Sequence, residues 1–378
     1  MSGKYPHMIS ACFLLFLGYG CIEYFEHSGI KDISGLLVVE GTIDSGETFI
    51  KLSRSGYINA TIREYDAVEN ALVYVESNDG NRSKAGTHTE KGEYVIPNGT
   101  LSSSLQYRLL ISLDGEEYVS TFQSPLFTPE IELSITKEKT GDPVLVSVST
   151  HDPLAQSPYY RWEYKENWEV HAELYANVTA VMFGAQVIEY IWHDLETSNN
   201  KYYCWGADSS RIFILDSTDK LIENRIRLKK LIEIEPADDR LSQLYFISVK
   251  QTMLSKEAFD YFSNLQENID KSGGLFSKMP SEMRGNIICI SDPEKTVIGY
   301  VDVSVPTYTE KYIERNDGFY ERPYNNCLSQ ITDDFESTMP VFYKTEGEEL
   351  KAPEDCIDCR RKRNASKNKP AFWPTNVL

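Results

Sequence analysis

Cysteine is the residue type of this 378-residue sequence whose number and spacing point most directly to chemistry. Cys21 stands directly behind an apolar segment, and we predict that its thiol is acylated. An exported chain meets oxidising conditions, in which its other cysteines are expected to pair. Outside the apolar segment these are the five residues Cys204, Cys289, Cys327, Cys356 and Cys359. Five is an odd number, so at least one thiol stays free, and Cys289 in the apolar run 286–290 is the best candidate for a buried one.

Two pairings are open for Cys356 and Cys359. Their C-x-x-C spacing suits a local disulfide, and each can instead reach Cys204 or Cys327. A structural zinc site needs four thiolates, typically from two such motifs, and only one is present. A thioredoxin-like redox motif belongs at the start of a helix that follows a strand, whereas this one lies in a polar tail. We therefore predict neither a metal nor any other cofactor.

Other residues that could do chemistry form no recognisable constellation. The sequence has no G-x-S-x-G, no H-E-x-x-H and no glycine-rich phosphate loop. His151-Asp152 and His193-Asp194 are adjacent pairs, but neighbours on a strand point to opposite faces, so adjacency does not make a catalytic dyad. The sequence therefore predicts a protein that is not an enzyme and has no catalytic residues.

The N-terminus has the layout of a secretory signal. Lys4 and His7 precede an apolar stretch over residues 8–17, and small residues follow just before Cys21. This pattern predicts a lipoprotein signal peptide over residues 1–20, a lipid anchor such as palmitate on Cys21, and a tether over residues 21–34. The alternative is an ordinary signal peptide followed by an incidental cysteine.

Charge and composition exclude several classes of protein. The chain has 57 acidic and 38 basic residues, a net charge of −19, which argues against nucleic acid as a partner. Its 24 Tyr, 16 Phe and 5 Trp exclude a disordered chain. An anionic membrane would repel such a body, so the lipid must hold it there. The aromatics at 159–168 either pack in a core, which we favour, or stack on a sugar or peptide.

The elements that must position these residues are mostly strands. We predict an immunoglobulin-like β-sandwich over residues 35–127, because short apolar or alternating segments are separated by turn signals. These segments are 36–43, 48–53, 71–76, 93–96, 107–112 and 118–122. The second and larger β-rich domain, residues 130–344, follows a boundary between Pro125 and Pro129.

The second domain is predicted to carry one clear helix, from an N-cap at Ser255 to Ile269, with Phe259, Phe262 and Leu265 on its buried face. Segments 286–290 and 297–303 are predicted to form a hairpin across the turn at 291–294. Residues 345–378 are predicted to be a polar, cysteine-containing tail. Its basic run 360–363 is either a solvated patch or a docking point for an acidic partner.

Several different short motifs follow one another along the chain in a characteristic order. They are the start 21–23, segments 37–43, 107–109, 114–118 and 160–163, the stretch 249–262, residues 280–287 and 299–300, and the ending 356–359 with 369–373. Together they resemble the family known as domain of unknown function 4249 (DUF4249), whose members are lipoproteins of the Bacteroidota cell envelope. The acidic residues Glu23 and Glu26 also look like the export signals of surface lipoproteins. The resemblance implies a mostly β, two-part lipoprotein, often encoded beside a TonB-dependent outer-membrane receptor.

The sequence therefore predicts a non-enzymatic lipoprotein on the surface of the outer membrane, held there by the lipid on Cys21. We expect an accessory to a TonB-dependent nutrient receptor that binds an oligosaccharide or peptide ligand or docks on the receptor. The alternative is a structural or assembly factor of the cell envelope that binds only protein partners. A deep aromatic-lined pocket would count against that alternative.

Overall fold

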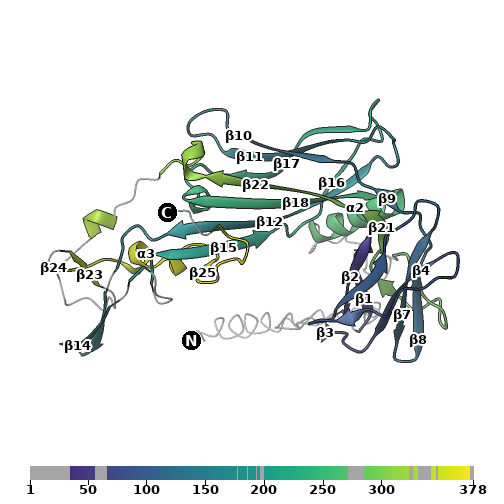
Figure 1. Cartoon of the computed structure of the whole chain (residues 1–378), viewed down its shortest axis with the longest axis horizontal. Helices are drawn as coiled ribbons and strands as arrows, with labels where there is room; N and C mark the ends of the chain where they lie inside the picture. Colours follow the sequence, from purple (N-terminus) through teal and green to yellow (C-terminus); the bar gives the residue numbers. More distant parts are fainter. Residues whose placement is uncertain are drawn as a thin grey trace, which may run out of the picture.

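The computed structural model describes residues 35–55, 66–176, 178–184, 186–192, 194–195, 200–270, 285–322, 327–330, 342–345 and 348–374. The predicted signal peptide, Cys21 and the tether lie outside these residues. The chain is mostly β with one clear helix, as predicted, and its strands build two sandwich-like parts and a small sheet at one end (Figure 1). Among the described residues, none of the helices has the length and apolar character that crossing a bilayer requires.

The first sandwich places two sheets face to face. One sheet consists of β1 (Leu37–Ile43), β2 (Gly46–Arg54), β3 (Asp66–Ala67), β5 (Thr87–His88), β6 (Glu93–Gly99), β9 (Leu126–Phe127), β20 (Val297–Ile298) and β21 (Asp302–Val305). The other has the order β19-β8-β7-β4, from β4 (Leu72–Ser77), β7 (Tyr107–Leu113), β8 (Glu116–Ser120) and β19 (Ile287–Cys289). Alternate residues such as Ile50 and Leu52 of β2 and Val73 and Val75 of β4 point inward and form one core.

The hairpin predicted for residues 286–303 is wrong. β19 pairs with β8 in one sheet, whereas β20 and β21 pair with β1 in the other. Both segments are short and apolar, and each lies beside a strand of the first sandwich instead of its own neighbour in sequence. The Asn286 side chain joins them, since its amide donates to the Val301 carbonyl at 2.7 Å and accepts from the Val301 N–H at 2.9 Å. Strands that we assigned to the second domain therefore complete the first sandwich.

The second sandwich has longer strands. Its smaller sheet is β10 (Ile131–Thr136), β11 (Val144–His151) and β17 (Arg225–Ile234). The larger sheet contains β12 (Tyr159–His171), β15 (Tyr203–Ser209), β16 (Ile214–Ser217), β18 (Leu244–Leu254), β22 (Thr307–Glu314) and β25 (Ala365–Ser366). Tyr160, Trp162 and Trp168 of β12 are buried between the two sheets, which confirms the core interpretation of these aromatics.

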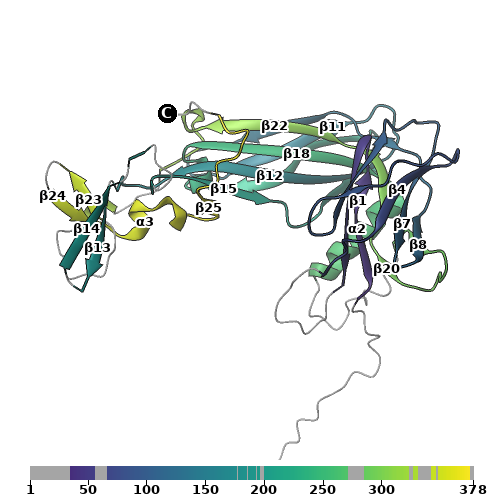
Figure 2. The same ribbon diagram turned by 60° about the horizontal axis from the view of Figure 1, so that its bottom comes forward.

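A small sheet lies at the end of the molecule opposite the first sandwich (Figures 1 and 2). Its order is β14-β13-β23-β24, from β13 (Val178–Phe183), β14 (Gln186–Trp192), β23 (Phe342–Thr345) and β24 (Glu348–Lys351). β13 and β14 form a hairpin that projects from the body. The short helices nearby are η4 (Cys327–Gln330), α3 (Glu354–Ile357) and η5 (Cys359–Arg361), and elsewhere are η1 (Asp239–Leu241) and η3 (Arg315–Asp317).

The C-terminal segment is folded onto the second sandwich instead of forming a polar tail. Cys359 forms a disulfide with Cys204 of β15, and Cys356 forms one with Cys327. The local Cys356–Cys359 pairing is therefore wrong, and the alternative of distant partners holds. Cys356 lies on α3 and Cys359 opens η5, so each thiol is buried against a different neighbour. Cys289 is free and buried, as predicted.

The helix α2 (Lys256–Asp270) matches its prediction. Ser255 caps it, because its hydroxyl accepts the Ala258 N–H at 3.2 Å. Phe259, Phe262 and Leu265 pack with Tyr300 of the first sandwich in one apolar cluster. The helix therefore lies where the two sandwiches meet, beside β21 and β9 in Figure 1.

Candidate functional site

A cleft of about 310 Å³ lies between the first sandwich, the helix α2 and the larger sheet of the second sandwich. We call it the junction cleft. Residues 38–42 of β1 and 298–300 line one side, residues 261–265 of α2 line another, and side chains of β12, β18 and β22 complete it. Its walls thus come from segments far apart in the sequence, which only the docking of both sandwiches brings together.

Aromatic rings line much of the junction cleft. Two of them, Phe49 and Tyr308, are 62% and 60% exposed, so they are presented to solvent and do not serve a core. The ring of Tyr261 packs against those of Phe262 and Tyr300, with centroids at 5.4 Å and 5.7 Å. Flat or apolar ligand faces stack well on such rings. The full aromatic set is Phe49, Phe213, Tyr261, Phe262, Tyr300 and Tyr308.

Arg161 supplies a buried cation to this cleft. Its residue is only 7% exposed, and its Nε–H has no hydrogen-bond partner among the described residues. The guanidinium stacks over the Phe262 ring at 4.7 Å and pairs with Glu163 at 3.4 Å. An N–H donor that is buried without an acceptor costs free energy.

Lys250 lies beside this pair. Across three strands Glu163, Lys250 and Tyr308 are direct neighbours in register, so their side chains share the face of the sheet that lines the cleft. Burial lowers the pKa of Lys250, and the Glu163 and Asp44 carboxylates oppose that shift. Within the described part of the chain its ammonium makes neither a hydrogen bond nor an ion pair. Its three N–H donors are thus available to a ligand.

Asp44 closes the charged side of the cleft. Burial raises the pKa of its carboxyl, although the Ser45 N–H and the Lys250 charge oppose the shift. The lining therefore holds carboxylates as well as cations, and it suits a ligand with several polar groups better than a simple anion.

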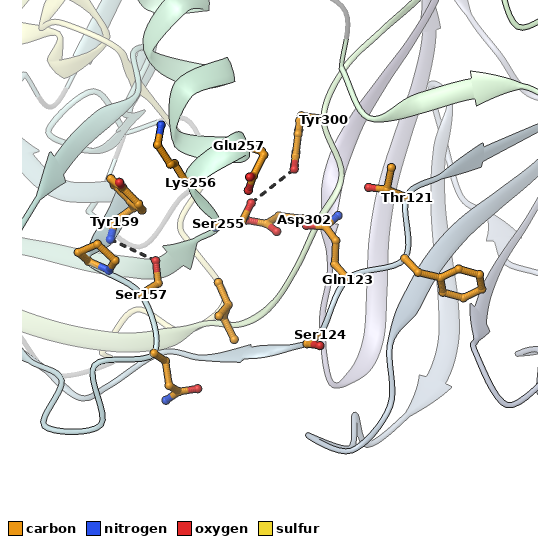
Figure 3. A pocket seen from close by; sticks show the side chains of 14 residues that line it. Thr121, Gln123, Ser124, Ser157, Tyr159, Ser255, Lys256, Glu257, Tyr300 and Asp302 are labelled. Atoms are coloured by element: carbon orange, nitrogen blue, oxygen red, sulfur yellow. Dashed lines mark hydrogen bonds between the residues drawn. The ribbon is translucent and has the colours of Figure 1, made fainter. Parts of the chain in front are cut away.

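A second hollow of about 530 Å³, the junction groove, lies at the first turn of α2. Figure 3 shows Ser255, Asp302 and Tyr300 gathered there, with Gln123 and Thr121 across the groove. Asp302 is 2% exposed and accepts the Ser255 N–H at 2.9 Å and the Val303 N–H at 3.1 Å. Burial raises the pKa of Asp302 to about 6 despite these bonds. Its role is to fix α2 to β21.

The residues singled out from the sequence do not meet in either hollow. The two disulfides lie near the opposite end of the second sandwich, and Cys21 and His193 lie outside the described residues. His151 contacts Arg225 at 3.3 Å, while the Asp152 carboxylate accepts backbone N–H groups, so they form no dyad. No three metal-ligating side chains converge among the described residues.

The basic run 360–363 lies at the surface, with Arg360, Arg361 and Arg363 exposed, as a solvated patch would be, and docking of an acidic partner there stays a prediction. Arg360 pairs with Asp358, Arg361 with Glu354, Lys362 with Asp239 and Arg363 with Asp208. These ion pairs hold the C-terminal segment to itself and to its neighbours.

The sequence did contain a signal for the junction cleft. In β12 the core residues Tyr160 and Trp162 alternate with Arg161 and Glu163, so one face of a buried strand carries charges. Charged residues on such a face require a polar cavity or an ion pair. The aromatic partners of the cleft gave no comparable signal, since they come from separate elements.

The fold and the cleft define a mostly β protein of two joined sandwiches with an aromatic-lined cavity at their junction. The family described as "Domain of unknown function (DUF4249)" matches residues 25–310, and the chain belongs to this family. No curated protein matches the chain.

Proposed function

We propose that this protein is a non-enzymatic, lipid-anchored protein of the outer-membrane surface that binds an oligosaccharide or peptide ligand in the junction cleft. It serves a TonB-dependent receptor as an accessory during nutrient uptake. The observation that carries the proposal is the pairing of aromatic walls with two cations, Lys250 and Arg161, of which the Arg161 Nε–H lacks an acceptor among the described residues. Rings that stack and cations that donate are the groups that recognise sugars and peptides.

The cleft favours this proposal over a purely structural role in the envelope. A protein that binds only other proteins has no need for an internal cavity that holds partly desolvated cations, because burying them costs stability. The anchor is supported by the signal at residues 1–20 followed by Cys21.

The first test is a calorimetric screen of the mature chain against defined oligosaccharides, neutral and uronic-acid-containing, and defined short peptides. For a ligand found in this way, Phe49→Ala with Tyr308→Ala should weaken binding at least about tenfold, since each ring loses its stacking contact. Both side chains are mostly exposed, so the fold should be unaffected.

Phe183→Ala is the matched control, because that phenyl ring is 79% exposed on the β13–β14 hairpin, away from the cleft. Equal affinity in the double variant and in wild type would refute binding at the cleft, as would a screen in which neither class of ligand binds. Affinity capture from detergent-solubilised outer membranes tests the receptor separately. Recovery of assembly machinery in place of a TonB-dependent receptor would favour the structural alternative.

A further inference from the structure

The β13–β14 hairpin presents large apolar side chains to solvent. Phe183, Ile188 and Trp192 are 79%, 64% and 62% exposed. Tyr190 and Trp192 alternate along β14 and lie on one face of the hairpin, Ile188 lies at a register shift between the strands, and Phe183 lies next to the turn. Exposed apolar side chains gathered in this way mark a contact surface.

The hairpin is almost uncharged. Between residues 178 and 192 Glu189 is the single charged residue, although the chain as a whole has a net charge of −19. Tryptophan and tyrosine next to aliphatic residues are the composition favoured at the boundary between lipid headgroups and acyl chains. A protein whose charged body is repelled by an anionic bilayer can enter it only through such a neutral segment.

The place of the hairpin agrees with a membrane in contact. In Figure 2 the hairpin and the start of β1 both lie on the lower side of the molecule, at opposite ends of it. The chain from Cys21 to β1 continues through the tether 21–34, whose fully extended length is at most about 50 Å. A tether of this length allows a bilayer that holds Cys21 to lie on the side to which the hairpin projects.

We propose that the β13–β14 hairpin inserts its apolar side chains into the headgroup–acyl boundary of the bilayer that holds Cys21. The orientation of the protein on the membrane depends on the lipid anchor at Cys21 that we propose. The affinity of the hairpin for lipid does not depend on that anchor. Once Cys21 is anchored, insertion is an intramolecular step, so a weak contact is enough to fix the orientation of the body.

The test separates these two points by making the anchor chemically. The unacylated mature chain is coupled through Cys21 to a maleimide lipid in phosphatidylcholine vesicles, because Cys289 is buried and the other described cysteines are in disulfides. Doxyl-labelled lipid quenches the fluorescence of tryptophans that enter the bilayer. The contribution of Trp192 is obtained by subtracting the fluorescence of the Trp192→Phe variant from that of wild type. We expect quenching of Trp192, lost in Phe183→Ser with Ile188→Ser.

The matched control is Leu154→Ser with Ile222→Ser, two apolar residues outside the hairpin that are 77% and 105% exposed, and it should keep the quenching. Adding anionic phosphatidylglycerol should reduce the quenching, since it repels the acidic body. Trp192 emission that is unaffected by the doxyl lipid overturns the proposal, and so does equal quenching in the serine variant. Hairpin-dependent capture of a receptor without lipid quenching would overturn it too and would reassign the surface to a protein partner.

Discussion

At the junction of the two sandwiches, burial has a large effect on the carboxyl group of Asp302. Its carboxyl is buried, and its acceptors are used by the backbone at the start of α2 and in β21. The raised pKa means that the folded state holds the proton up to about pH 6, whereas the usual value is 3.8. The charged form is therefore the less stable one at this place.

A pH dependence follows from this shift. Between the two values the folded state binds more protons than the unfolded state, so the free energy of unfolding falls as pH rises. The total fall from Asp302 is about 3 kcal/mol, and it is complete above about pH 6. Denaturant unfolding at several pH values should show this fall as the difference between wild type and Asp302→Asn, because the other carboxyls contribute equally to both.

The matched control for that experiment is Asp355→Asn, at an exposed position. It should keep the wild-type slope. If Asp302→Asn also keeps it, the carboxyl is not protonated in the folded state and the account of the junction is wrong.

At the scale of residues, the sequence predicted the buried core better than it predicted the lining of the junction cleft. We expected the aromatics at 159–168 to pack in a core, and Tyr160, Trp162 and Trp168 do so. The cleft was out of reach, since Phe49, Arg161 and Tyr308 meet only after separate sheets have docked.

At the scale of elements, the two disulfides attach the C-terminal segment to the second sandwich. The Cys204–Cys359 bond spans 155 residues and the Cys327–Cys356 bond spans 29. Chain-entropy arguments then assign about 5 kcal/mol to the first bond and about 3.5 kcal/mol to the second. Cys204→Ser with Cys359→Ser should therefore lower the free energy of unfolding more than Cys327→Ser with Cys356→Ser does.

Denaturant unfolding of the two double variants measures the difference. Peptide mapping without reduction gives the connectivity independently. A peptide in which Cys356 and Cys359 are linked to each other, or a larger loss from the shorter loop, would contradict the structure.

Spacing alone could not decide this pairing. The C-x-x-C motif permits a local bond, and the partners became clear only when α3 and η5 were placed against η4 and β15. The helix α2 was predictable because its signals, the Ser255 cap and the aromatic stripe, are local. Strand segments 287–305 were recognisable as strands, but their partners are residues far away in the sequence.

For the whole molecule, the first sandwich is built from two distant parts of the chain. Residues 35–127 alone lack β19, β20 and β21, whose Ile287, Cys289, Val297 and Val303 are buried in the same core. We therefore expect fragment 35–127 to be unfolded or aggregated by circular dichroism and thermal melting. The same fragment joined to residues 285–305 by a flexible linker should fold cooperatively.

Cooperative melting of fragment 35–127 on its own would contradict this account of the core. Failure of the linked fragment, with the mature chain folding normally, would show that the second sandwich is also needed.

For the export that we propose, which would start at the N-terminus, this division of the first sandwich sets an order of events. The earliest strands to emerge must wait, with apolar faces uncovered, until the segment around residue 300 has also crossed. The strands of the second sandwich that precede residue 255 emerge during that delay and can begin to pair, whereas its β22 and β25 follow the last strand of the first sandwich. The first sandwich thus stays incomplete until residues near 300 have emerged, and during that interval its uncovered apolar faces are open to aggregation.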